Sequence, residues 1–273
     1  MQIAVTGPNG RLGSALVKKG CIPLDFNICD EKACEKELGR IKPDALINCA
    51  AWTDVDGAED KDNLAEVLNT NLRGPGILRT NHSGLLIQIS TGFVFGEGDG
   101  PFAEDDEPLP ISWYGWSKWG GEKAAQIRMP TLVVRTLDLF GPETPIDFVR
   151  QVRDIVEFNI EMELPDTLFG TPTYIPHLAE ALLIAVEREL TGTIHIAGDL
   201  TLSRYDWGRM IAEYFEADPD LIKPTKKIKG KAPRPLRGGL KVDKAVNMGL
   251  PIYSPLDGLR GISEWENARG QAS

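Results

Sequence analysis

The stretch "TGPNGRLG", residues 6–13, decides how the rest of the sequence is interpreted. It places Gly7, Gly10 and Gly13 at a G-x-x-G-x-x-G spacing, between an apolar run and an amphipathic segment. In a strand–turn–helix unit, the first glycine makes the turn, the second lets the backbone approach a pyrophosphate, and the third lets helix and strand pack closely. The start of the helix also offers free N–H groups to phosphates. The stretch therefore predicts a dinucleotide site, although glycines needed only for packing give the same spacing.

Strand-like and helix-like segments alternate on the C-terminal side of this turn. We expect strands at 3–7, 21–26, 44–52, 85–91 and 131–136, and helices at 11–20, 31–43 and 61–84. This alternation is typical of an α/β fold with a doubly wound parallel sheet, the Rossmann type.

The pattern loosens after about Gly141, where short strands and helices mix with proline-rich loops. We expect residues 1–142 to form the dinucleotide-binding domain and 172–200 to return to it. The segments 143–171 and 201–273 then form a smaller, mixed α/β part that binds substrate.

Composition argues against several functional classes. A net charge of −10 disfavours a nucleic-acid surface, which needs a basic face. No apolar run reaches the ~18 residues of a membrane span, and "MQIAVTG" is interpreted as a strand start and not as a signal peptide. The cysteines lack metal-ligand spacing and indicate a reducing, cytoplasmic setting without disulfides; they are Cys21, Cys29, Cys34 and Cys49. The oligomeric state stays open, with a homodimer as one option.

Asp25 is the candidate for binding the adenosine ribose. It lies 18 positions after Gly7, close to the ~20 at which an acidic residue accepts hydrogen bonds from the ribose hydroxyls. A solvated loop carboxylate is the alternative. Lys18 and Lys19 could instead favour a 2′-phosphate, so the choice between NAD and NADP stays open.

The stretch "SWYGWSKWGGEK", residues 112–123, contains a candidate proton donor. Tyrosine has a pKa of about 10, and a nearby cation brings it toward the working range. Lys118 lies four residues after Tyr114, on the same face of a helix, and can supply that charge. Thr91 and Ser90 end a buried strand, where ligands of doubly wound sheets collect. We interpret Ser90 as a residue that only ends its strand. The alternative for Tyr114 and Lys118 is that they are a surface aromatic residue and a solvated lysine.

The glycine-rich turn together with Y-x-x-x-K resembles the extended short-chain dehydrogenase/reductase superfamily. The segments "NCAAWTDVDGAE", "ISTGFVFGEGDGPFAEDDEPLP", "YGWSKWGGEK", "FGTPT" and "APRPLRGGL" are similar to the dTDP-4-dehydrorhamnose reductase family, and the resemblance covers residues 1 to about 260. It implies a Rossmann domain, NADPH or NADH as cofactor, and reduction of the C4 ketone of a 4-keto-6-deoxy nucleotide sugar, as in dTDP-L-rhamnose synthesis.

The same resemblance implies roles for individual residues. Thr91 would bind the substrate carbonyl, Tyr114 would deliver the proton, and Lys118 would keep the pKa of Tyr114 low and orient the cofactor. Cofactor contacts are expected from Gly7, Asn9, Gly10, Arg11, Leu12, Asp25, Phe26, Cys49, Ala50, Ala51, Tyr114 and Lys118. Substrate contacts are expected from Thr91, Gly92, Phe93 and Arg234.

Two places depart from the family pattern. The family usually has Asp-Tyr after its catalytic threonine, where this chain has Gly92 and Phe93. It usually has Ser-Trp where this chain has Leu137 and Asp138. Both places would face the substrate, so we expect either a different sugar or a weaker activity.

A basic stretch in the C-terminal part reverses the acidic character of the chain. Residues 223–241 hold eight basic residues and no acidic one. A solvated loop accounts for most of the lysines, but an arginine can also bind a diphosphate bidentately. Arg234 matches the family's substrate-side Arg-Pro and is our first candidate. The acidic run at 103–107 is interpreted as a solvated loop, and no metal site is expected.

Two other functions remain open at this point. The regulatory beta subunit of methionine adenosyltransferase resembles the same family, so a non-catalytic NADP-binding subunit is one alternative. A nucleotide-sugar epimerase or dehydratase, which regenerates its cofactor in each cycle, is the other. The presence of Thr91, Tyr114 and Lys118 favours catalysis over binding alone.

Overall fold

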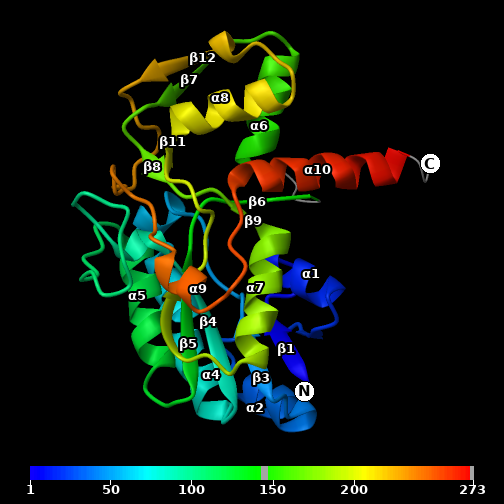
Figure 1. Ribbon diagram of the computed structural model, residues 1–273. Helices are drawn as coiled ribbons and strands as arrows, with labels where there is room; N and C mark the ends of the chain where they lie inside the picture. The colour runs from blue at the N-terminus through cyan, green and yellow to red at the C-terminus, as the bar shows by residue number, and fades with distance from the viewer. Residues whose placement is uncertain (143–146, 271–273) are drawn as a thin grey trace.

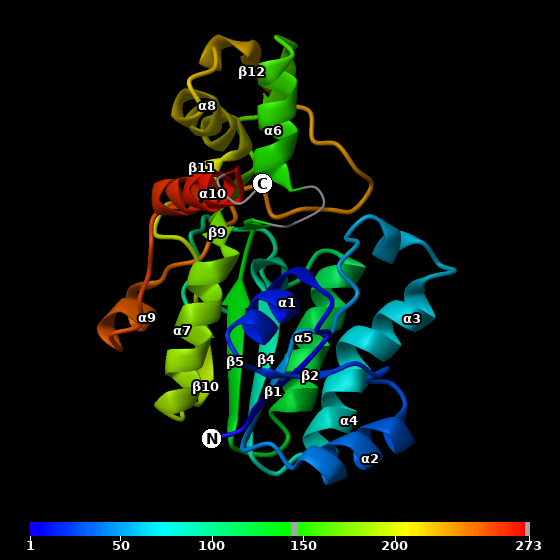
Figure 2. The same cartoon turned by 90° about the vertical axis from the view of Figure 1, so that its right-hand side faces the viewer.

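A six-stranded parallel sheet forms the centre of the molecule (Figures 1 and 2). The computed structural model describes residues 1–142 and 147–270. The strands of this sheet are β1 (Ile3–Thr6), β2 (Ile22–Leu24), β3 (Ala45–Asn48), β4 (Leu85–Thr91), β5 (Thr131–Thr136) and β10 (Gly192–His195). Their order is β10-β5-β4-β3-β1-β2, with all pairs parallel. The predicted doubly wound parallel sheet is thus confirmed.

Helices cover both faces of this sheet because strand side chains alternate between them. On one face, Val5 and Ile47 pack into a core with α1 and α7. On the other face, Ala4 and Leu46 pack into a second core with α2 and α4. Figure 2 shows these two helix layers on either side of the strands. The helices are α1 (Arg11–Lys18), α2 (Glu31–Ile41), α4 (Gly74–Asn81), α5 (Trp113–Ala125) and α7 (Ile175–Glu187).

The helix expected over 61–84 forms in three pieces. These are α3 (Leu64–Leu68), a π-helical turn η2 (Asn69–Arg73) and α4. Within η2, the buried Asn71 side chain bonds the backbone of Trp52 at 2.8 and 3.0 Å and the hydroxyl of Ser117 at 2.9 Å. Single π-turns of this kind occur mostly inside α-helices and are frequent at functional sites. The π-turn is followed directly by Gly74 and Pro75, which open α4.

The C-terminal part lies over the carboxyl ends of the sheet strands (Figure 1). Its core joins α6 (Phe148–Glu157), α8 (Arg204–Tyr214) and α10 (Pro255–Gly270) around the buried Trp207. Three two-stranded pieces complete it: β12-β7, β11-β8 and β6-β9. Their bounds are β6 (Leu139–Phe140), β7 (Met162–Pro165), β8 (Phe169–Gly170), β9 (Thr173–Tyr174), β11 (Leu202–Ser203) and β12 (Ile222–Thr225). The short helix η4 (Pro219–Leu221) also belongs to this part, whereas η1 (Gly57–Glu59) and η3 (Gly92–Val94) follow β3 and β4 of the central sheet.

One segment of the C-terminal part belongs to the core of the sheet. Helix α9 (Asp243–Asn247) contacts β10, and Ala245 and Leu250 are buried in the same cluster as α7.

The four cysteines are free thiols. Within the described ranges, no helix combines the length and the apolar character needed to cross a membrane.

Candidate active site

A cavity of about 510 Å³ lies where the sheet strands end and the C-terminal part begins. Loops after several different strands contribute to it, as expected for a ligand site in a doubly wound sheet. It is lined by Gly10, Arg11, Leu12, Gly13, Cys49, Ala51, Thr53, Val55, Ile89, Ser90, Thr91, Phe93, Tyr114, Lys118, Thr136, Leu137, Asp138 and Leu139.

The glycine-rich turn has the geometry that a dinucleotide needs. Gly7 has a left-handed φ of +64°, which L-side chains rarely adopt. A Cβ atom on Gly13 would clash with the carbonyl oxygen of Gly7, whereas one on Gly10 would meet only that oxygen, at 3.3 Å. Gly10 is the N-cap of α1 and lines the cavity, and no side chain caps the helix. The first turn can therefore offer backbone N–H groups to a diphosphate.

The predicted cofactor residues divide into two groups. Seven of them line the cavity, namely Gly10, Arg11, Leu12, Cys49, Ala51, Tyr114 and Lys118. The remaining residues of the set are not among its lining residues; they are Gly7, Asn9, Asp25, Phe26 and Ala50.

This second group lies next to the first. Asp25 directly follows β2 and accepts a hydrogen bond from the side chain of Asn9 at 3.1 Å. Asn9 belongs to the same turn as Gly10. Phe26 and Ala50 pack against one apolar cluster beneath the sheet edge. Their predicted contacts with a cofactor stay predictions.

The three predicted catalytic residues come together in the cavity. Thr91 ends β4 and caps η3, accepting a hydrogen bond from the backbone N–H of Phe93 at 3.2 Å. Tyr114 and Lys118 lie one turn apart near the start of α5, which Ser112 caps through the N–H of Gly115 at 3.2 Å. A side-chain hydrogen bond with Thr91 favours a lower pKa for the phenol of Tyr114. The Nζ atom of Lys118 donates to the carbonyl oxygen of Ile89 at 2.7 Å.

The expectation that Lys118 brings the pKa of Tyr114 down is wrong in this structure. Burial raises the pKa of Tyr114 to about 12, and only the hydrogen bond with Thr91 opposes the shift. The physical reason is that desolvation disfavours the phenolate more strongly than any neighbouring group stabilises it. Burial also lowers the pKa of Lys118 to about 8, against the opposing effects of Glu122 and Cys49. Tyr114 therefore holds its proton at neutral pH, as a proton donor must.

The side of the cavity that faces the C-terminal part carries the unusual residues. Phe93 packs edge-on against Tyr114, with ring centroids 5.6 Å apart. Asp138 and Leu137 both line the cavity. Asp138 has a φ of +50° and forms an ion pair with Arg204, the first residue of α8. The departures at 137–138 and at Phe93 thus lie beside the predicted catalytic hydroxyls, while Gly92 packs behind them against Leu137.

Arg234 does not line this cavity. Its guanidinium pairs with Asp56 at 2.8 Å, and the backbone N–H groups of Lys231 and Ala232 donate to the same carboxylate at 2.9 Å each. The hydrogen bond from Arg234 is the largest of the effects that lower the pKa of Asp56 to about 2. The loop around Arg234 is therefore tied to the segment after β3, and its contact with a diphosphate stays a prediction.

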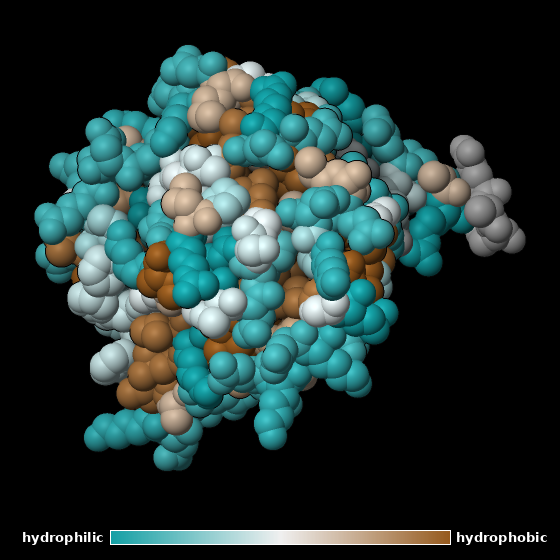
Figure 3. Space-filling model, turned by 90° about the horizontal axis from the view of Figure 1, so that it is seen from below, coloured by the Kyte–Doolittle hydropathy of each residue, from teal (hydrophilic) through white to brown (hydrophobic). Residues whose placement is uncertain are grey.

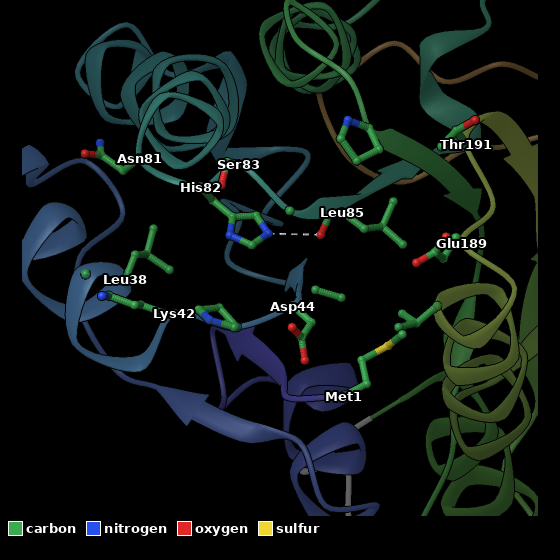
Figure 4. A pocket seen from close by; sticks show the side chains of 16 residues that line it. Met1, Leu38, Lys42, Asp44, Asn81, His82, Ser83, Leu85, Glu189 and Thr191 are labelled. Carbon is green, nitrogen blue, oxygen red and sulfur yellow. Dashed lines mark hydrogen bonds between the residues drawn. The ribbon is translucent and has the colours of Figure 1, made fainter.

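A larger cavity, of about 880 Å³, lies at the opposite end of the sheet strands (Figure 4). Its walls include Lys42, Asp44, His82 and Glu189, and the ring of His82 bonds the carbonyl oxygen of Leu85 at 3.2 Å. Figure 3 views this end, where hydrophobic patches lie among mostly hydrophilic residues. It faces the amino ends of the strands and contains none of the predicted residues, so we assign the chemistry to the smaller cavity.

Sequence reasoning missed several residues of the site. Thr53, Val55, Thr136 and Leu139 line the cavity, and the Thr136 hydroxyl has no hydrogen-bond partner among the described residues. Thr136 could have been found as the last residue of a predicted strand. The other three follow strands at distances that no local pattern sets.

Comparison with known proteins agrees with this geometry. The family model of the RmlD substrate binding domain matches residues 1–254. The chain belongs to the dTDP-4-dehydrorhamnose reductase family. The enzyme of that name from Mycobacterium tuberculosis is 32% identical, over 86% of this chain and 82% of its own length. The dTDP-4-keto-6-deoxy-D-glucose reductase of Streptomyces niveus is 30% identical, over 98% of this chain and 95% of its own.

A crystal structure from the same family extends the similarity to three dimensions. A dTDP-4-dehydrorhamnose reductase from Clostridium acetobutylicum superposes with a TM-score of 0.89 at 28% identity, covering 98% of this chain and all of the other. The family resemblance inferred from the quoted motifs is thus confirmed along nearly the whole chain.

Proposed function

We propose that the protein is an NAD(P)H-dependent reductase of a 4-keto-6-deoxy nucleotide sugar, with a dTDP-sugar as its substrate. The observation that carries this proposal is the convergence of Thr91, Tyr114 and Lys118 on one cavity that also contains the glycine-rich turn. The names of the relatives from Mycobacterium tuberculosis and Streptomyces niveus support the same reaction class.

The residues of the turn fit a nicotinamide dinucleotide. Gly10 and the first turn of α1 would hold its diphosphate, and Lys118 would bond its ribose hydroxyls, since an ammonium has three donors. When bound, the reduced nicotinamide supplies the hydride for the ketone carbon. Cys49 and Ala51, which follow β3, are small and leave room in the same cavity.

The chain itself supplies the proton and the hydrogen bonds. Because the pKa of Tyr114 is about 12, its phenol is protonated at neutral pH and can donate to the substrate oxygen as negative charge develops there. Thr91 lines the same cavity and offers a second hydroxyl to the same oxygen. Both side chains are at most 8% exposed, so these hydrogen bonds form in a largely dry site.

We also propose a division of labour along the chain. Residues 1–142 with 172–200 bind the cofactor, and 143–171 with 201–273 bind the sugar nucleotide. The ion pair between Asp138 and Arg204 joins the two parts at the cavity. Because Ala245 and Leu250 pack into the core of the sheet, the segment around them anchors the second part to the first.

The deciding experiment measures oxidation of NADH and NADPH in the presence of dTDP-4-keto-6-deoxy sugars. Stoichiometric loss of cofactor and formation of the alcohol support the proposal. Conversion of a nucleotide sugar without net cofactor consumption would indicate an epimerase or dehydratase. Tight cofactor binding with no turnover of any of these sugars would indicate a binding-only subunit.

A further inference from the structure

A buried row of charges lies directly behind the catalytic residues. Glu122 of α5 is 1% exposed, Arg135 of β5 is 3% exposed and Lys118 is 4% exposed. Charged side chains are almost never buried this deeply unless they are paired. Lys118 is accounted for by its place in the cavity, whereas Glu122 and Arg135 do not line it.

Both oxygens of the Glu122 carboxylate accept hydrogen bonds. Arg135 donates to it bidentately, from Nε to Oε1 and from Nη2 to Oε2, both at 2.9 Å. The hydroxyl of Ser90 donates to Oε1 at 2.5 Å. Ser90 and Arg135 are neighbours across β4 and β5, so two adjacent strands fix the position of one carboxylate.

Helix α5 lies beside strand β4 (Figures 1 and 2). Three contacts link the helix to consecutive residues of the strand. Tyr114 interacts with Thr91, Lys118 bonds the carbonyl oxygen of Ile89, and Glu122 accepts the Ser90 hydroxyl. The three helix residues are spaced four apart and therefore share one face of α5. The carboxylate thus stands one turn beyond the ammonium, on the side away from the phenol.

We propose that Glu122 is a positioning residue of this active site, whose carboxylate, fixed by Arg135 and Ser90, keeps the buried Lys118 charged and aligned beneath Tyr114 and Thr91. The inference rests on the proposed reductase function. Its physical basis is that a buried ammonium needs a nearby anion to remain protonated.

The surroundings of Lys118 support this assignment. Among the described residues, the titratable groups that act on its ammonium are Glu122 on its own helix and Cys49 after β3. Burial raises the pKa of the Cys49 thiol, so Cys49 is neutral at physiological pH. Tyr114 is neutral as well, and Arg135 is a cation beyond Glu122. Glu122, which lies one helical turn from Lys118 on the same face of α5, is therefore the anion that we assign to this charge.

The test measures the charge on Lys118 directly. The 13Cε resonance of Lys118, assigned by its loss in Lys118→Met, is titrated in the whole protein carrying 13C-labelled lysine. Neutralising the carboxylate in Glu122→Gln should lower the midpoint of this titration by about one pH unit or more. The alkaline limb of the kcat profile should move to lower pH by the same amount. Glu266→Gln, which breaks the pair with Arg153 in the C-terminal part, is the control and should leave both unchanged.

A double variant separates positioning from stability. Glu122→Gln alone leaves Arg135 buried without its anion, which destabilises the fold. The double variant Glu122→Gln with Arg135→Met removes both charges and should regain much of the stability, while the midpoint of Lys118 stays low.

A midpoint equal to that of the parent in the folded double variant overturns the proposal and makes the pair a structural one. Because this titration needs no substrate, an inactive parent would refute the reductase function and not the role of Glu122.

Discussion

The carbonyl oxygen of Ile89 accepts a hydrogen bond from Nζ of Lys118 at 2.7 Å, two residues before Thr91 on the same strand. This bond fixes the ammonium against the backbone of β4, at the edge of the cavity where a cofactor ribose would bind. The lysine therefore links the helix that carries Tyr114 to the strand that carries Thr91, and it brings a positive charge to the site.

Lys118→Met should weaken cofactor binding and lower kcat together, because it removes both the donors and the charge. In the parent, the pKa of Lys118 is lowered to about 8, so the charged form is lost as pH rises through that value. We expect kcat and cofactor affinity of the parent to fall above about pH 8. Lys118→Met should show no such fall in affinity with pH. Fluorescence titration with NADH at several pH values measures the affinity of both proteins. A parent whose affinity is flat from pH 7 to 9 would contradict this role.

Gly10→Val should abolish dinucleotide binding and leave a folded protein. A Cβ atom at position 10 would contact only the carbonyl oxygen of Gly7, at 3.3 Å, so the fold can accept it. The valine side chain would then occupy the place of the diphosphate in the cavity. Gly13→Val is the matched comparison. It should lower the unfolding temperature, since its Cβ clashes with the backbone of Gly7. Thermal unfolding and cofactor titration of both variants check the pair of outcomes. Full affinity in folded Gly10→Val would exclude the dinucleotide site.

The fold was predictable where a local pattern has a single physical solution. The spacing of Gly7, Gly10 and Gly13 places a tight turn, a ligand approach and a close helix contact in one motif, and the structure shows this geometry. The proximity of Tyr114 and Lys118 was predictable in the same way, because residues four apart lie on the same face of a helix.

Other features depend on contacts distant in sequence. The pKa of Tyr114 was mispredicted because burial, which comes from tertiary packing, outweighs the neighbouring charge. The partner of Arg234, Asp56, lies 178 residues away. The pair between Glu122 and Arg135 joins a helix to a strand, and neither residue has a local signal for the other.

Asp25 should make the enzyme prefer NADH to NADPH. It follows β2 beside the glycine-rich turn, where its carboxylate can bind ribose hydroxyls and would repel a 2′-phosphate. Lys18 lies at the far end of α1, about 10 Å along the helix from Arg11. It is thus poorly placed for the phosphate. Asp25→Ser should raise the affinity for NADPH relative to NADH, as measured by the ratio of the two Kd values.

Arg11 provides the competing explanation for cofactor choice, because it lines the cavity at the start of α1. If Arg11→Gln loses NADPH affinity while Asp25→Ser leaves the ratio unchanged, Arg11 sets the preference and the role given to Asp25 is wrong.

Arg234→Ala should raise the KM for the nucleotide sugar by about tenfold or more, as expected for the loss of a hydrogen bond to a charged group. Cofactor affinity should not change. Asp56→Asn is the control, since it breaks the ion pair but keeps an acceptor for the N–H groups of Lys231 and Ala232. Its KM should change much less. Equal effects of the two variants would mean that Arg234 acts by holding the loop.

Tyr114→Phe should lower kcat by about 10² to 10⁴, the usual contribution of a general acid, with cofactor binding nearly intact. The substitution removes one buried hydroxyl and keeps the ring, which packs edge-on against Phe93 in a cluster with Ala58 and Val67. The variant should therefore fold like the parent. Because the pKa of Tyr114 is about 12, the parent keeps this proton throughout the neutral range, so the defect should be equally large at pH 6 and pH 8.

Tyr253→Phe is the control for the loss of a tyrosine hydroxyl. Its phenol lies 3.4 Å from the carboxylate of Glu180 on α7 and does not line the active-site cavity. Its kcat should stay within about twofold of the parent, a difference of roughly 0.4 kcal/mol in barrier height. Stopped-flow oxidation of NADH or NADPH with the keto sugar measures both variants. If Tyr114→Phe reduces the ketone at the rate of Tyr253→Phe, the proton comes from another group, and Thr91, which lines the same cavity, is then the hydroxyl to examine.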